Sequence, residues 1–163
     1  MTKQIMDRAA ADNVYLHKDF HGALNQALIY VERVFGAAAV KDYLRQFAGT
    51  FHAPLRRAMS ERGLDALKDY LADVYSDEGA DIRIETIPCG REPDELTLHV
   101  KECPAVSHIR KMGLTVSPLF LETVKTVNEA ICSGTPFDAG LLEYDPETGR
   151  SVQRFRRIAG RPR

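Results

Sequence analysis

Residues 82–102 read IRIETIPCGREPDELTLHVKE, and apolar side chains occupy alternate positions in the runs at both ends of this stretch. A period of two is typical of strands with one buried face, because successive side chains point to opposite sides of a sheet. Between the two runs, GREPD supplies the glycine and proline that favour a chain reversal. The stretch therefore predicts an antiparallel hairpin with strands at residues 82–88 and 95–102.

The chain before this hairpin has a different period, with apolar residues recurring every three or four positions. This spacing predicts amphipathic helices, since it places the apolar side chains on one face. We expect four of them: from Asp19 as N-cap to Gly36, from Ala37 to Pro54, which ends or kinks the helix, from Arg56 to Arg62, and from Leu64 to just before Gly79.

The chain after the hairpin is expected to hold two more helices and a second hairpin. Pro104 suits the first turn of a short helix that ends at Gly113, and a longer helix follows Pro118. The second hairpin is predicted at residues 140–144 and 151–157, around the turn sequence DPETG.

The last predicted strand does not alternate cleanly. Val152 and Phe155 have opposite parity, which indicates either a bulge or a strand that is covered on both faces. We expect the two hairpins to join in one sheet.

Together these elements predict an α+β fold, in which N-terminal helices, an antiparallel hairpin, two helices and a second hairpin complete a small antiparallel sheet. A length of 163 residues suits one domain, which we place at residues 19–158 between an N-terminal arm at 1–18 and a basic tail at 159–163. With 11 Gly, 8 Pro and 3 Cys, the composition excludes collagen-like and disulfide-dense classes.

Charge is distributed unevenly along the chain. The formal net charge is −1, but residues 150–163 hold six arginines and no acid, which leaves 16 basic and 23 acidic side chains in residues 1–149. An acidic body repels nucleic acid, so we expect no nucleic-acid partner. We instead expect Arg154 and Arg156 to bind carboxylates, either those of the same subunit, those of a second subunit or those of an anionic ligand.

The sequence contains no signal-peptide pattern and no run of 18 apolar residues, so we expect a cytoplasmic protein with no membrane partner. Cys89, Cys103 and Cys132 show no C-x-x-C spacing and are expected to be reduced. A Cys89–Cys103 disulfide is disfavoured, because the hairpin would separate the two residues by about 25 Å. The exposed edge of the terminal hairpin favours a homodimer.

The segment ECPAVSHI at residues 102–109 is the main candidate for chemistry. Cys103 stands where a strand ends and a helix begins, a position that lowers the pKa of a thiol. His108 follows after slightly more than one helical turn, and His99 has the parity of Cys103. This spacing predicts a catalytic group with Cys103 as nucleophile and His108 or His99 as base. The alternative is a buried structural cysteine near an ordinary histidine.

Polar residues on the first helices are candidates for lining a ligand pocket. His21 and Asn25 lie one helical turn apart, and His52 follows the second predicted apolar run. The alternative is a solvated helix face. His17 and His21 have the i, i+4 spacing of metal ligands, but neither H-E-x-x-H nor paired C-x-x-C is present. We therefore expect no metal and no cofactor.

Three further features carry a resemblance to a known family. The segment VKECP at residues 100–104, Gly113, and Gly149 followed six positions later by Phe155 resemble the pattern of the L-2-amino-thiazoline-4-carboxylic acid hydrolase family. The order of elements is also similar to that of four-vinyl-reductase and haem-NO-binding ligand domains, in which helices precede a small sheet that covers a pocket.

The first resemblance implies a hydrolase that opens a cyclic amidine-like molecule at a C–N bond, with Cys103 at the family's Cys-Pro position. The family's further cysteines have no counterpart in residues 122–126 and 151–153. The competing hypothesis is a non-catalytic sensor or carrier that binds a small ligand between the helices and the sheet. Both hypotheses name a small molecule as the partner.

Overall fold

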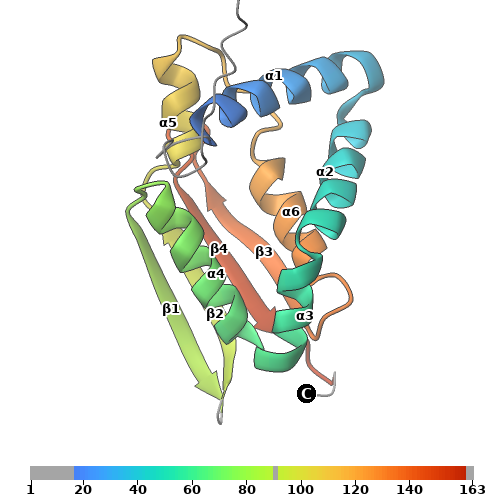
Figure 1. Ribbon diagram of the computed structural model, residues 1–163, viewed down its shortest axis with the longest axis vertical. Helices are drawn as coiled ribbons and strands as arrows, with labels where there is room; N and C mark the ends of the chain where they lie inside the picture. Colours follow the sequence, from blue (N-terminus) through green and yellow to red (C-terminus); the bar gives the residue numbers. More distant parts are fainter. Residues whose placement is uncertain (1–16, 90–91, 161–163) are drawn as a thin grey trace, which may run out of the picture.

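The computed structural model describes residues 17–89 and 92–160, which form six helices and a four-stranded sheet (Figure 1). The predicted α+β fold is confirmed. Most of the predicted N-terminal arm and the last three residues of the predicted tail lie outside the described residues. No helix in the described ranges combines the length and apolarity that a membrane crossing requires.

The sheet is antiparallel throughout and has the strand order β1-β2-β4-β3. Pairing of β2 with β4 joins the two hairpins in one sheet, as the sequence predicts. The strands are β1 (Ile82–Cys89), β2 (Glu92–Val100), β3 (Phe137–Tyr144) and β4 (Ser151–Arg157).

Four helices precede the sheet, and two lie between its hairpins: α1 (His17–Phe35), α2 (Ala37–Phe51), α3 (Ala53–Arg62), α4 (Leu64–Asp77), α5 (Pro104–Lys111) and α6 (Glu122–Cys132). Two starts differ from the prediction. α1 is already helical at His17, the first described residue, so Asp19 is not its N-cap, and α3 begins at Ala53 rather than Arg56. Pro54 fits inside the first turn of α3, because a backbone N–H there has no intrahelical partner to lose.

Helices cover one face of the sheet, where α4 packs on β2 and α6 packs on β3 (Figure 1). The opposite face is formed by the other set of alternating side chains. We call it the open face; its central rows hold Arg83, His99 and Val152, then Glu85, Thr97 and Arg154. These side chains are exposed or half-buried.

The irregular parity of the last strand has a simple cause. β4 is regular, with Ser151, Gln153 and Phe155 buried on the helix-covered side and Val152 on the open face. The register shift instead lies in β3, between Leu141 and Glu143. The predicted bulge in β4 is therefore wrong. Val152 and Phe155 differ in parity because Val152 is an apolar residue on the open face, whereas Phe155 is in the core.

The buried apolar side chains form two clusters. One lies between the sheet and α3, α4 and α6, and includes the fully buried Phe155. The other lies between α1, α2 and α5, and includes Val106 and Leu28. Cys103 packs at the edge of the second cluster, at the end of the sheet where α5 begins.

Candidate functional site

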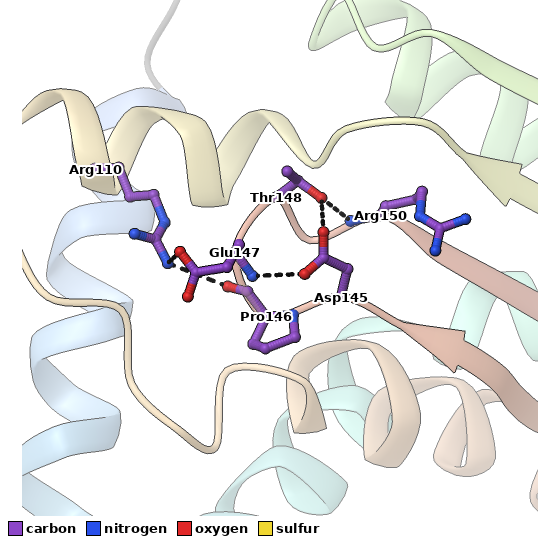
Figure 2. A network of polar contacts seen from close by, with 6 residues as sticks. All are labelled: Arg110, Asp145, Pro146, Glu147, Thr148 and Arg150. Atoms are coloured by element: carbon purple, nitrogen blue, oxygen red, sulfur yellow. Dashed lines mark hydrogen bonds and ion pairs between the residues drawn. The ribbon is translucent and has the colours of Figure 1, made fainter.

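The β3–β4 turn at residues 145–149 is fixed by its own polar groups (Figure 2). The Asp145 carboxylate accepts hydrogen bonds from the backbone N–H of Glu147 at 3.0 Å and from the Thr148 hydroxyl at 2.6 Å. The Gly149 N–H donates to the Asp145 carbonyl at 2.8 Å. The Thr148 hydrogen bond is the main cause of a lowered Asp145 pKa. An aspartate that caps its own turn in this way gives the turn a defined shape.

This turn is anchored on the start and end of α5. The Cys103 N–H donates to the Thr148 carbonyl at 2.9 Å. At the other end of the helix, Arg110 lies 3.0 Å from the Glu147 carboxylate and also donates to the Pro146 carbonyl (Figure 2). The turn therefore lies over Cys103 at a fixed place.

Gly149 allows the turn to approach this closely. Its φ is 68°, a conformation that side chains disfavour, and a Cβ added there would lie 2.4 Å from Cys103 Cβ and 2.8 Å from Val106 Cγ2. The glycine noted in the family resemblance thus contacts the cysteine noted in the same resemblance. Backbone conformation and space both require glycine at this position.

Cys103 is the N-cap residue of α5, as predicted, but the expected lowering of its pKa is wrong. Burial raises the pKa of the Cys103 thiol, and it outweighs the backbone amides of Val106 and Ala105, which act in the opposite direction. The charges of Glu78 and Glu102 raise the pKa further. Desolvation therefore exceeds the effect of the helix N-terminus, because the turn and the second cluster shield the sulfur from water.

Two tyrosines from different elements lie close enough to Cys103 to interact with it electrostatically. They are Tyr75 in α4 and Tyr144 at the end of β3. Burial raises the pKa of both hydroxyls, that of Tyr144 to about 12. Both therefore remain protonated hydrogen-bond donors at neutral pH. We call Cys103, Tyr75, Tyr144 and Glu78 the Cys103 site.

A buried amide connects the Cys103 site to the sheet and to α6. Gln153 donates to the Tyr75 hydroxyl at 3.4 Å and to the Ser151 hydroxyl at 3.0 Å, while its oxygen accepts from Asn128 at 2.7 Å. Because Gln153 is only 2% exposed, these partners hold its amide in one orientation.

His21 approaches the same site through Glu78. Its Nε2 lies 3.3 Å from Glu78 Oε1, although the angle does not make a hydrogen bond. Glu78 directly follows α4, and its charge raises the pKa of both Cys103 and Tyr75. Of the predicted site residues, His21 is therefore the one that this carboxylate links to Cys103.

The two predicted bases lie elsewhere. His99 is on the open face, where its Nε2 is 3.3 Å from Glu85 and 3.5 Å from Arg83. His108 lies in α5, and five residues of helix turn a side chain about 140° away from the Cys103 side. Its Nε2 is buried and has no hydrogen-bond partner among the described residues. No hydrogen bond among the described residues joins either histidine to Cys103.

Asn25 and His52 also lie apart from Cys103. Asn25 is fully buried, donates to the Thr115 carbonyl at 2.9 Å and accepts from the Ser117 N–H at 2.8 Å. His52 lies between α2 and α3, with its ring edge-on to Phe51 and Tyr70. Burial and then Arg56 lower the pKa of His52, so its ring is neutral at pH 7. Both side chains hold segments of the fold together.

The two predicted arginines are on the open face. Arg156 donates to Asp138 at 3.1 Å, so the expected carboxylate contact is made within the same chain, and Arg154 lies opposite Thr97. A hollow of about 250 Å³ at one end of this face is lined by His99, Lys101 and Arg150, among others. Its basic side chains already face acids: Lys101 is 3.0 Å from Asp81, and Arg150 is 3.6 Å from Glu143.

The Cys103 site contains three residues that the sequence analysis missed, namely Tyr75, Tyr144 and Glu78. Tyr75 and Glu78 lie three residues apart at the end of α4 and Tyr144 lies at the end of β3, and no pattern in the sequence around Cys103 points to either segment. Gln153 did carry a signal, because it is a polar residue at a core position of its strand. A buried amide of this kind indicates a polar network in the core.

Within the described part of the chain, no three His, Cys, Asp or Glu side chains are grouped so as to hold a metal ion. No protein-family model matches the chain, and no curated protein matches it. The chemistry of the site therefore rests on its own residues: a thiol beneath a turn, with two protonated hydroxyls and a carboxylate within electrostatic range of it.

Proposed function

We propose that the chain is a small-molecule hydrolase that opens a cyclic amidine-like ring at a C–N bond in the Cys103 site. The observation that carries this proposal is that Tyr75, Tyr144 and Glu78 all lie within electrostatic range of Cys103, beside the turn that packs on it. The family resemblance of the segment around Cys103 supports the same reaction. We further propose that the protein acts in the cytoplasm and as a homodimer.

The charges of the site suit a cationic ring. An amidine is protonated near neutral pH, and Glu78 supplies a partner of opposite sign close to the thiol. A bound cation would offset the negative charges that raise the pKa of Cys103, so the thiolate would form when the substrate is present. The two tyrosine hydroxyls would orient the ring by hydrogen bonding.

In the proposed reaction, the Cys103 proton passes to the Glu78–His21 pair. The thiolate adds to the amidine carbon, and the ring C–N bond breaks as the nitrogen takes up a proton. Water then adds to the same carbon, the C–S bond breaks, and the thiol is restored. In this reaction Glu78 is the base and His21 is its partner, because His21 contacts Glu78. The predicted bases His99 and His108 take no part in it.

The test is turnover of cyclic amidines by the full chain, beginning with 2-amino-thiazoline-4-carboxylate and identifying a product heavier by one water. We expect Cys103→Ser to lower turnover by at least about 100-fold, as removal of a nucleophile does. The matched control is Cys132→Ser, which alters a second free, buried thiol in α6. Full turnover by Cys103→Ser would show that the reaction takes place elsewhere.

A second candidate, a non-catalytic sensor or carrier, is favoured by the raised pKa of Cys103, since a protonated thiol is a weak nucleophile. Under this alternative the same amidines raise the melting temperature without being consumed. Cys103→Ser would then keep most of that shift, whereas Glu78→Gln would reduce it by removing the carboxylate that a cation needs.

A further inference from the structure

The solvent side of α1 carries an apolar stripe that no other helix or strand of the described residues covers; within α1, Arg33 lies over the Tyr30 ring, 5.7 Å from its centroid. The stripe consists of Phe20, Ala23, Ala27, Tyr30 and Val34, all exposed. Phe20, Tyr30 and Val34 are 49%, 53% and 48% exposed. α1 lies at the end of the molecule with one side free of other elements (Figure 1).

The spacing of the stripe is that of a coiled-coil seam. Its members follow one another at intervals of three, four, three and four residues, which is the a/d pattern of two heptads. The opposite side of α1 is already used, since Leu28 and Asn25 are buried there against the rest of the fold. A helix that is apolar on both sides is typical of a buried helix, so the stripe requires a second partner.

The stripe is complementary to itself, which points to a second copy of this chain. In an antiparallel pair that sets Ala27 opposite Tyr30 of the other copy, Ala23 falls opposite Val34. Each small side chain then faces a larger one, so the two helices can approach closely and interdigitate. A twofold axis reproduces the same contacts on both copies, as an isologous interface requires.

The area is sufficient for such a pair. With about 200 Å² for an aromatic side chain, the exposed parts of the stripe alone amount to roughly 400 Å² per copy. Two copies would bury roughly 800 Å² of the stripe, and the side chains that flank it on α1 add the rest of the roughly 1,000 Å² at which specific interfaces begin. An exposed apolar patch of this size is within the range in which functional patches on monomers are found.

We propose that the exposed stripe of α1 is a homodimer interface, in which α1 packs antiparallel to α1 of a second copy with Ala27 opposite Tyr30. This inference does not depend on the Cys103 site. It also places the contact on a helix, rather than on the edge of the terminal hairpin that the sequence suggests.

The test is sedimentation velocity of the full chain at micromolar concentration, where we expect a dimer. Tyr30→Glu and Ala27→Lys, each alone, are expected to raise the dissociation constant by at least about 100-fold, because each buries an unpaired charge. The matched control is Ile87→Glu on the open face, a similarly exposed apolar residue, which is expected to stay dimeric.

Mixing the two variants tests the antiparallel pairing. In a mixed dimer, the lysine introduced in one copy faces the glutamate introduced in the other. The second, symmetry-related contact between positions 27 and 30 keeps its native Ala27 and Tyr30. We therefore expect the mixture to dimerise although neither variant does so alone. A monomeric parent chain, or variants as dimeric as the parent, would overturn the interface; a mixture that stays monomeric would overturn the pairing. Circular dichroism establishes that each variant is folded.

Discussion

At the scale of single residues, Gly149 and Cys103 define each other's surroundings. The turn can lie over the cysteine only because position 149 has no side chain, and the cysteine is shielded from water because the turn lies there. The same contact explains why the position of Cys103 at a helix start does not lower its pKa. The turn at the end of the sheet thus leaves Cys103 half-buried.

Gly149→Ala is therefore expected to destabilise the protein by about 2–4 kcal/mol, because it adds both backbone strain and a steric clash. The comparison is Gly134→Ala, where φ is also positive, at 80°, but no atom lies within 4 Å of the added Cβ. Urea unfolding of both variants separates the two causes. Equal losses of free energy would mean that the close approach to Cys103 contributes nothing.

Glu78→Gln is expected to lower the pKa of Cys103, since the carboxylate charge is one of the causes that raise it. The shift is measured from the pH dependence of the Cys103 Cβ chemical shift, by carbon NMR on cysteine-labelled protein. Glu143→Gln is the control, because its exposed carboxylate is paired with Arg150. An unchanged Cys103 titration in Glu78→Gln would remove Glu78 from the Cys103 site.

At the scale of elements, Asn25 fastens the loop after α5 to α1. Its side chain satisfies one carbonyl and one N–H of that loop, at Thr115 and Ser117, while fully buried itself. Asn25→Ala leaves both backbone groups without partners, so we expect a loss of about 2–3 kcal/mol in the free energy of unfolding.

The matched control is Gln26→Ala, the adjacent exposed position, which is expected to change stability by less than about 0.5 kcal/mol. Chemical denaturation measures both variants. If Asn25→Ala unfolds at the same urea concentration as the parent, Asn25 has no structural role, and its predicted role in ligand binding is favoured.

The elements themselves follow from local sequence patterns. The hairpins and the six helices are set by the period of their apolar residues and by turn residues such as those around Asp145, which act over a few positions. The Cys103 site is different, because the end of α4, with Tyr75 and Glu78, and the end of β3, with Tyr144, approach Cys103 only after α4, β3 and α5 have packed. The chemistry of a site assembled by tertiary packing cannot be derived from spacing.

His99 shows how far the alternation within one strand can predict which side chains meet. The alternation of apolar residues correctly places Leu98 towards the core and His99 on the opposite face. Cys103 lies beyond the end of β2, where the chain turns into α5, so strand parity no longer applies to it. The two residues consequently point into different surroundings.

At the scale of the whole molecule, the buried thiols and hydroxyls couple stability to alkaline pH. Burial raises the pKa values of Cys103, Cys132, Tyr75 and Tyr144, those of Cys132 and Tyr144 to about 12. In the unfolded chain these groups lose their protons at lower pH, near 9 for cysteine and 10 for tyrosine. Deprotonation then favours unfolding, so this stability is complete below pH 9 and is lost as pH rises towards 12.

We therefore expect the free energy of unfolding to fall by about 2 kcal/mol or more between pH 8 and pH 11, since one unit of pKa difference corresponds to about 1.4 kcal/mol. Urea unfolding at a series of pH values measures this slope. Cys132→Ala lowers the stability at pH 8 by leaving a small cavity, but it is expected to flatten the slope above pH 9, because Cys132 has one of the largest pKa differences. A parent protein equally stable at pH 8 and pH 11 would show that these side chains reach water without unfolding.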